Sequence, residues 1–263
     1  MTIVTVIGDC TTTTSVALAS CWPAADDVIV VEADPSGGSL SGWLDTPASP
    51  SLATLVAALG SDDGGSTLDT VMAMTHRSAA GIRFLAAPVR STSAHRALAE
   101  SARVVAALAP APMTVLADIG RLHGADPLSA IVRSAAANLI VHRQVPASAA
   151  AAAVRIERLV ETIEHVAATG SPCMLAVIGA EPFDPAEIAA FVNDSMPGRD
   201  IEHVHLADDP LAAAVVAGRT GVSAKRLNRL PLMRSATTTA RRLLDLSTIA
   251  RRATSSTEEQ RVS

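Results

Sequence analysis

The stretch IVTVIGDCTTTTS, residues 3–15, decides the fold of this chain together with VIVVEADPSGGSL, residues 28–40. The first stretch predicts a β-branched strand that passes through a short turn into a helix with hydroxyl side chains at its start. The second predicts a buried strand that ends in carboxylates and a Gly-Gly turn. The first backbone N–H groups of a helix have no partner within the helix and point outward. A strand, a turn and a helix in this order therefore form a layout that cradles phosphate.

Strands and helices alternate along the rest of the chain. Short apolar runs predict further strands at residues 82–87, 113–117, 138–142, 173–178 and 202–206. Caps, prolines and helical spacing predict helices at residues 11–21, 39–44, 51–59, 67–76, 92–108, 126–136, 147–168 and 232–252, and helix starts at 184 and 209. This alternation predicts an α/β fold of three layers, with a mostly parallel sheet flanked by helices. We expect one domain over residues 1–253 and a polar C-terminal tail over residues 254–263.

The composition excludes several classes of protein. The chain has 263 residues, 49% of them hydrophobic, and a net charge of −5, so nucleic acid is not an expected partner. Three scattered cysteines are too few for a disulfide framework and suit a reducing cytosol. We find no run of ~18 apolar residues that would span a membrane, and no signal region. We expect a cytoplasmic protein, at most peripheral at the inner face of the membrane.

The two opening stretches resemble the MinD/ParA family of deviant-Walker P-loop ATPases, of the SIMIBI class, which position cell structures and segregate DNA. The family has a threonine run after its P-loop lysine, as Thr11–Thr14 here, and an Asp-Pro-x-Gly-type segment on the next strand, as residues 34–37 here. Asp118, at the end of a later predicted strand, matches the Walker B aspartate, and Gly120 follows it as in the family's switch segment. The resemblance implies a P-loop NTPase-like fold, ATP and Mg²⁺ as cofactors, and a homodimer.

The phosphate loop departs from the family pattern. The family loop has several glycines and two lysines, whereas the whole loop here is Gly8-Asp9-Cys10 and the one lysine of the chain is Lys225. The abundance of Ala and Arg is typical of a high-GC, actinobacterial genome, but Cys10 is not Arg either, so the charge was not replaced. With the threonine runs aligned, the resemblance assigns nucleotide contacts to Gly8, Asp9, Cys10, Thr11, Thr12 and Thr13, and magnesium contacts to Thr11 and Asp118.

These departures weaken the predicted phosphate site. Losing one charge-assisted contact costs roughly 1.5–3 kcal/mol, and the shorter loop also removes N–H donors. Asp9 places a carboxylate where the phosphates would lie, and like charges repel. Alternatively, Asp9 caps the N–H groups of the following helix. We expect binding of ATP and Mg²⁺ to be weak or absent, and we do not expect hydrolysis.

Three carboxylates at strand ends allow two interpretations. In the family, carboxylates at the positions of Glu32 and Asp34 help to place the attacking water, and Asp118 would hold magnesium through water. In the other interpretation, all three bind helix N-termini or Arg121 and keep the crevice closed. Both place the carboxylates at the carboxyl ends of parallel strands, where α/β sheets bind ligands.

Other chemistry has weaker support in the sequence. His203 and His205 share a face of a predicted strand and would need His142 or Cys173 to complete a metal site, but no spacing supports one. Cys10 precedes a helix, where a thiolate is favoured, although Asp9 beside it opposes the charge.

The C-terminal segment also has two interpretations. Relatives of the MinD type carry a basic amphipathic helix that binds membranes, and residues 232–252 mix leucines with arginines. Alternatively, this helix packs on the sheet. A basic, irregular stretch over residues 219–229 precedes this helix. Such a run of charges usually lies on the solvated surface of a protein.

Our leading hypothesis is a degenerate MinD/ParA-like protein that binds and positions without hydrolysis, or with very weak hydrolysis. The resemblance implies partners in a pilus, conjugation, secretion, division or partition apparatus. One alternative is an active ATPase with a lysine-free loop that uses hydroxyls and backbone donors. Another is an adaptor at a membrane surface.

Overall fold

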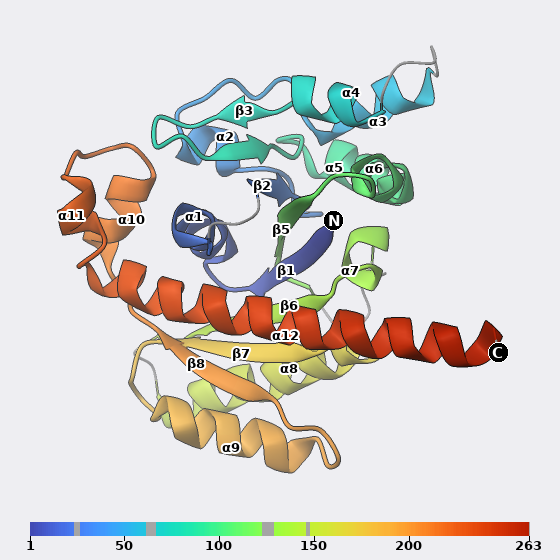
Figure 1. Cartoon of the computed structure of the whole chain (residues 1–263). Coiled ribbons are helices and arrows are strands. Elements are labelled where there is room, and N and C mark those ends of the chain that lie inside the picture. Colours follow the sequence, from blue (N-terminus) through green and yellow to red (C-terminus); the bar gives the residue numbers. More distant parts are fainter. Residues whose placement is uncertain (24–26, 62–66, 123–128, 146–147, 263) are drawn as a thin grey trace.

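The computed structural model describes residues 1–23, 27–61, 67–122, 129–145 and 148–262, with side chains described up to residue 250. Within these ranges one eight-stranded sheet has the order β3-β4-β2-β5-β1-β6-β7-β8 (Figure 1). The strands are β1 (Thr2–Gly8), β2 (Asp27–Glu32), β3 (His76–Arg77), β4 (Arg83–Leu85), β5 (Met113–Gly120), β6 (Ala137–Arg143), β7 (Cys173–Ile178) and β8 (Glu202–Leu206). Neighbouring strands pair in parallel, except β3 and β4, which are antiparallel.

Helices cover both faces of the sheet (Figure 1). One face carries α1 (Thr11–Cys21), α2 (Leu40–Trp43), α10 (Pro210–Val216) and α12 (Pro231–Val262). The other carries α3 (Leu52–Gly60), α4 (Thr67–Ala73), α5 (Ser91–Ala99), α6 (Ser101–Leu108), α7 (Ala130–Arg133), α8 (Ala149–Ala167) and α9 (Pro185–Ser195). A short helix, α11 (Ala224–Leu227), lies within the predicted irregular stretch between α10 and α12. The predicted three-layer α/β fold is confirmed.

The alternation of side chains on β1 explains the two cores. Ile3 and Ile7 point into the core beneath α3 to α9, whereas Val4 and Val6 point into the core beneath α1 and α12. All four are at most 3% exposed. A strand covered on both faces is apolar at nearly every position, which is why Ile and Val surround Thr5 in β1. The buried hydroxyl of Thr5 donates a hydrogen bond to Oδ1 of Asn138 at 2.6 Å.

The strand order places a binding crevice at the end of β1. This strand lies between β5 and β6, and the chain builds one side of the sheet before β5 and the other side after it. In such doubly wound sheets, ligands bind outside the carboxyl ends of the strands where the order reverses. Gly8, the last residue of β1, stands at that point.

Some predicted boundaries were wrong. The helix expected over residues 67–76 ends at Ala73, and His76 begins the edge strand β3, where its ring stacks on that of Phe84. The helix expected over residues 92–108 is divided at Glu100, whose φ of −97° and ψ of 11° are not helical.

The long helices also differ from expectation. Helix α12 continues to Val262, so the segment expected to be a polar tail has a helical backbone up to that residue. In α8, the apolar spacing Val154, Leu159, Ile163 and Val166 predicts a core-facing side, but Val154 is 48% exposed, while Ile156 two residues later is buried. The predicted helix start at Asp126 and the residue Ala147 lie outside the described residues, as do residues 62–66 of a predicted loop.

Candidate functional site

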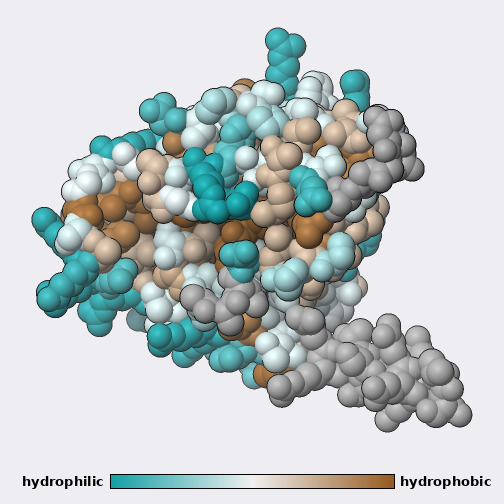
Figure 2. Space-filling view, turned by 45° about the horizontal axis from the view of Figure 1, so that its top comes forward, coloured by the Kyte–Doolittle hydropathy of each residue, from teal (hydrophilic) through white to brown (hydrophobic). Residues whose placement is uncertain are grey.

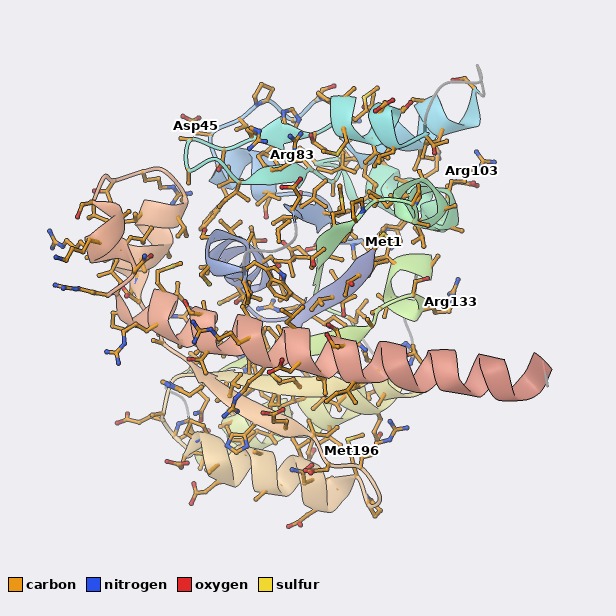
Figure 3. All side chains as sticks on the ribbon, viewed as in Figure 1. Met1, Asp45, Arg83, Arg103, Arg133 and Met196 are labelled. Carbon is orange, nitrogen blue, oxygen red and sulfur yellow. The ribbon has the colours of Figure 1, made fainter. Side chains whose placement is uncertain are left out.

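A cavity of about 970 Å³ opens at the carboxyl ends of β1, β2 and β5. Its walls come from the start of α1, the loop after β2, helices α5 and α6, the end of β5, and α7. Ligand sites of proteins typically enclose about 300–1,000 Å³, so this volume suits a small organic ligand. Apolar side chains such as Leu98 and Leu122 line one part, and Thr11, Thr12 and Thr13 line another. Arg133, which also contributes to the wall, extends from α7 away from the sheet (Figure 3).

The loop between β1 and α1 is two residues long. β1 ends at Gly8 and α1 begins at Thr11, so only Asp9 and Cys10 connect them. Gly8 has a φ of +115°, and a Cβ there would overlap the carbonyl oxygen of Val141 on β6. Cys10 adopts a left-handed conformation, with a φ of 53°, in order to turn the chain directly into the helix. The loop is therefore too short to wrap around a phosphate chain.

Asp9 turns away from the cavity toward arginines. Its Oδ1 accepts a hydrogen bond from Nε of Arg121 at 3.0 Å, and its Oδ2 accepts one from a terminal nitrogen of Arg155 at 2.9 Å. The backbone N–H of Arg143 donates to Oδ2 at 3.1 Å. Asp9 is not among the described residues that line the cavity, and no described side chain caps α1. The interpretation of Asp9 as a helix cap was therefore wrong, while its place relative to bound phosphates stays a prediction.

Arg121, Arg143 and Arg155 bring positive charge to the loop from three other elements. They follow β5, end β6 and lie on α8, respectively. Sequence reasoning missed Arg143 and Arg155, because residues so far from Asp9 along the chain carry no spacing signal. The strand order was the one available clue, since it places the ends of β5 and β6 on either side of Gly8.

Asp118 lies beneath the start of α1. It is 1% exposed, and its Oδ2 accepts a hydrogen bond from the hydroxyl of Thr12 at 2.7 Å. Burial raises the pKa of Asp118, while the hydroxyls of Thr11 and Thr12 lower it. Asp118 is not among the described residues lining the cavity, so the threonines stand between this carboxylate and any ligand.

Glu32 binds backbone rather than solvent. Its Oε1 accepts hydrogen bonds from the N–H groups of Ser39 at 2.7 Å and Leu40 at 2.8 Å, at the start of α2. Its Oε2 accepts one from Ala87 at 2.9 Å. Burial raises the pKa of Glu32 to about 7, against the lowering effect of these three donors. This arrangement is that of the second sequence interpretation, in which the carboxylate binds a helix N-terminus.

Asp34 organises the loop that follows β2. Its Oδ1 accepts hydrogen bonds from the backbone N–H of Ser36 at 2.7 Å and from the Ser36 hydroxyl at 2.6 Å. Its carboxylate also lies against Gly120, where a Cβ would overlap it. Asp34 lines the cavity and is the carboxylate, among those predicted at the strand ends, that faces it.

No family model matches the sequence, and no curated protein is significantly similar to it. Solved structures do match. A ParA family ATPase from Chlorobium tepidum TLS gives a TM-score of 0.67 at 15% identity, over 91% of this chain and 97% of that one. The cell division ATPase MinD from Pyrococcus furiosus gives 0.68 at 13% identity, over 93% and 99%. MinD from Pyrococcus horikoshii OT3, complexed with Mg-ADP, gives 0.59 at 18% identity, over 95% and 98%.

The chain has the fold of the ParA and MinD ATPases. This confirms the fold that the residues around the threonine run had implied. The matches cover nearly the whole of each of those chains, so the likeness extends over the entire ParA/MinD fold. At these identities the likeness concerns the fold, and the chemistry of the site depends on this chain's own residues.

Within the ParA/MinD fold, the residues predicted to bind magnesium meet partly. Thr11 and Asp118, the two residues that the resemblance assigned to magnesium, lie close together at the start of α1, and Thr12 joins them through its hydrogen bond to Asp118. Oxygen ligands of this kind suit Mg²⁺. Among the described residues, however, no three His, Cys, Asp or Glu side chains gather so as to hold a metal ion. Thr11, Thr12 and Asp34 are among the described residues with side-chain oxygens that line the cavity, and they would be the candidates to hold a nucleotide-bound Mg²⁺.

The other candidate groups do not assemble. His203 and His205 share the exposed face of β8, as predicted, while His142 is buried on β6. Burial raises the pKa of the Cys10 thiol, and the charges of Asp9 and Asp208 raise it further, against the lowering effect of Arg143 and Arg121. The position at a helix start therefore does not produce a thiolate, and Asp9 opposes the charge as the sequence predicted.

The C-terminal helix packs on the sheet along its first half. Leu232, Met233, Ala236, Ala240 and Leu243 are buried in the core beneath α1. This is the second of the two interpretations of the segment. Within the described part of the chain, no helix combines the length and apolar character that crossing a membrane requires.

The basic stretch before α12 contacts a residue of the cavity wall. Its Arg219 lies over the ring of Trp43, 5.9 Å from the ring centroid, and Trp43 lines the cavity. A cation over an indole ring contributes roughly 0.5–1 kcal/mol at exposed sites. The segment between α10 and α11 is thereby held next to α2.

Proposed function

We propose that this protein is a binding and positioning module on the ParA/MinD fold that does not hydrolyse ATP, or hydrolyses it very weakly. The observation that carries the proposal is the two-residue loop between β1 and α1, in which Asp9 binds arginines and Cys10 occupies the lysine position. Such a loop offers a triphosphate no lysine and few backbone donors. Each lost donor to a developing charge costs roughly 2.7–4 kcal/mol of transition-state stabilisation.

The partner in this proposal is another protein, belonging to a pilus, conjugation, secretion, division or partition apparatus. A MinC:MinD cell division protein complex from Aquifex aeolicus is among the similar structures, so this fold presents surfaces to partner proteins. The surface of this chain also carries hydrophobic residues between hydrophilic ones on the face shown in Figure 2. A homodimer and a cytoplasmic location belong to the same proposal, whereas peripheral binding at the inner membrane face belongs to the alternative of a membrane adaptor.

A second candidate function is that of an active ATPase. It is favoured by the threonines at the start of α1, which line the cavity and adjoin Asp118. Two of the similar structures hold ligands of this class, an ATP complex of a McdA variant from Cyanothece and the MinD complex with Mg-ADP. In this chain, Thr11 to Thr13 and the first N–H groups of α1 would have to replace the lysines.

Thermal unfolding with and without ATP and Mg²⁺ separates the two functions. A site with a Kd of about 10 µM would raise the unfolding free energy by roughly 2.7 kcal/mol at about 1 mM ATP. We expect no saturable rise for the native chain, because the loop lacks cations. The double variant D9G/C10K restores a glycine and a lysine before the threonines, and we expect it to gain a rise.

Each outcome of this titration supports a different function. A saturable rise for the native chain, together with release of phosphate from ATP, would overturn the pseudo-ATPase proposal in favour of the ATPase. A rise without phosphate release leaves a nucleotide-binding but non-hydrolysing module. The absence of a rise in both chains would mean that the shortness of the loop, rather than its charge, abolishes binding.

A further inference from the structure

We infer that Arg121 and Arg155 form an oxyanion-binding site in which the carboxylate of Asp9 is the resident anion. A ligand bearing one carboxylate or one phosphate group would take this site by displacing Asp9 from Arg121. The inference deepens the proposed function and rests on it in one respect, namely that the cavity beside Arg121 is a ligand site.

The contacts around Asp9 have the form of an anion cradle. Two nitrogens of the Arg121 guanidinium, Nε and a terminal one, each lie 3.0 Å from Oδ1. A terminal nitrogen of Arg155 lies 2.9 Å from Oδ2, and the Arg143 N–H donates to the same oxygen at 3.1 Å. Guanidinium groups present donors in a planar fork that matches carboxylate and phosphate oxygens. The donors come from three separate elements, so the tertiary fold, rather than a local turn, assembles them.

Within the cradle, the anion Asp9 is more buried than the cations Arg121 and Arg155. The side chain of Asp9 is 15% exposed, whereas that of Arg121 is 72% and that of Arg155 is 38% exposed. A dissolved anion therefore reaches the arginines from outside while Asp9 contacts them from within. Ion pairs with such exposed partners contribute roughly 0–1 kcal/mol, so an incoming oxyanion can compete with Asp9.

Arg121 connects this cradle to the cavity. It lines the cavity, whereas Asp9 is not among the described lining residues. Thr11, Thr12 and Thr13 line the same cavity at the N-terminus of α1, where a second set of donors is directed outward. A group held by Arg121 would lie between the guanidinium and these N–H groups.

The charges nearby limit the ligand to a single oxyanion. Asp9 pairs with Arg121, Asp34 lies against the neighbouring Gly120, and two cations already share the Asp9 carboxylate. One added oxyanion replaces Asp9 as the partner of Arg121 while Asp9 keeps Arg155, so that each of the two cations then has one anion. A triphosphate would add several negative charges at once. The described contacts of Asp9 include the guanidinium groups of Arg121 and Arg155 alone, and two cations do not balance that many charges. Arg143 does not help, because Asp208 takes its guanidinium at 2.7 Å.

The test measures the binding of inorganic phosphate and, separately, of acetate to the full chain by calorimetry. We expect weak binding by the native chain and at least tenfold tighter binding by D9N, because the amide no longer neutralises the arginines. The double variant D9N/R121Q should lose that gain. E202Q is the matched control: it frees Arg242 from a similarly exposed ion pair that lies outside the cradle, and it should leave the affinity unchanged. The probe that D9N binds more tightly identifies the class of ligand.

A second measurement covers the case in which D9N does not fold. In the native chain, the Nε resonance of Arg121 should shift and saturate as phosphate or acetate is added, while that of Arg242, which pairs with Glu202, stays in place.

Three results would overturn the inference. They are a D9N affinity equal to that of the native chain, a D9N/R121Q variant that keeps the gain, and an Arg121 resonance that does not move. None of these bears on the ATP titration above. A native chain that binds and hydrolyses Mg-ATP would defeat the proposed function and leave the behaviour of D9N toward phosphate to be judged alone.

Discussion

The residues at the carboxyl edge of the sheet are mostly occupied with one another. Glu32 binds three backbone N–H groups, and Asp118 binds the Thr12 hydroxyl. Asp9 binds two arginines. A carboxylate that already has such partners is poorly placed to activate water or to hold a metal, because its lone pairs are in use. At the residue scale, the site is therefore arranged for internal order, with Asp34 as the carboxylate that faces the cavity.

Glu32 predicts how stability depends on pH. Its pKa is raised to about 7 by burial, from an ordinary value of 4.5, so between these pH values the folded chain holds a proton that the unfolded chain has released. Stability must then fall as pH rises through this window, by up to roughly 3 kcal/mol from this group. Burial raises the pKa of Asp118 too, so that group acts in the same direction. Urea unfolding at pH 5 and pH 7.5 measures the difference.

The variant E32Q serves as the control. Glutamine does not titrate, so the slope of stability against pH should become smaller. Its NH₂ group faces the Ala87 donor in place of Oε2, and the variant should be less stable at every pH for that reason. A native chain whose stability rises between pH 5 and pH 7.5, or an E32Q slope equal to the native one, would contradict the assignment.

At the scale of elements, helix α1 is the centre of the site. Its first turn lines the cavity, its buried side contacts β5 and α12, and the hydroxyl of Thr12 joins it to the end of β5. No described side chain caps its N-terminus, and Cys10 enters it in a left-handed conformation. By contrast, α9 begins with a capping box between Asp184 and Glu187. The uncapped start of α1 marks the place where the fold leaves donors for a ligand.

The junction between α1 and β5 predicts the effect of Thr12→Val. The variant keeps the shape of the side chain but removes the donor to the buried Asp118 carboxylate, and we expect it to destabilise the protein by roughly 1–3 kcal/mol. Thr13→Val makes the same change one residue away from this contact and should cost much less. Denaturant midpoints of the two variants give the comparison. Equal losses would mean that the hydroxyl of Thr12 does not stabilise the junction.

At the scale of the whole molecule, one hydrophobic core lies on each face of the sheet. The long helix α12 closes the face that carries α1 and extends beyond the sheet toward the C-terminus (Figure 1). Its apolar residues from Leu232 to Leu243 complete that core. A helix whose apolar side is used in this way has little left to insert into a lipid surface.

This packing predicts that the full chain does not bind anionic vesicles. After incubation with vesicles rich in phosphatidylserine, we expect the protein to stay in the supernatant on sedimentation. A chain ending at Ala250 should behave in the same way, since the buried apolar residues of α12 precede that point. Sedimentation of the full chain, and its loss in the shortened chain, would instead support the membrane adaptor.

The sequence by itself determined the layers of the fold and the edge of the sheet at which the crevice lies. The runs at β1, β2, β5, β6 and β7 are largely apolar because both faces of a central strand are buried, so they could be recognised one at a time. Hydroxyls after β1 and carboxylates at the ends of β2 and β5 placed the site at the carboxyl edge of the sheet. The two-residue edge strand β3 was missed, because two residues carry no period.

Only the tertiary structure decided what the charged residues do. Asp9 has the same neighbours in sequence whether it faces a phosphate, caps a helix or binds arginines. Its choice depends on Arg121 and Arg155, which the strand order brings to it from distant elements. Charge interactions act through space over a few ångströms, whereas sequence patterns report only residues within a turn or a strand of one another. The sequence therefore predicted which segments are buried, but it did not predict which charged residues pair with one another.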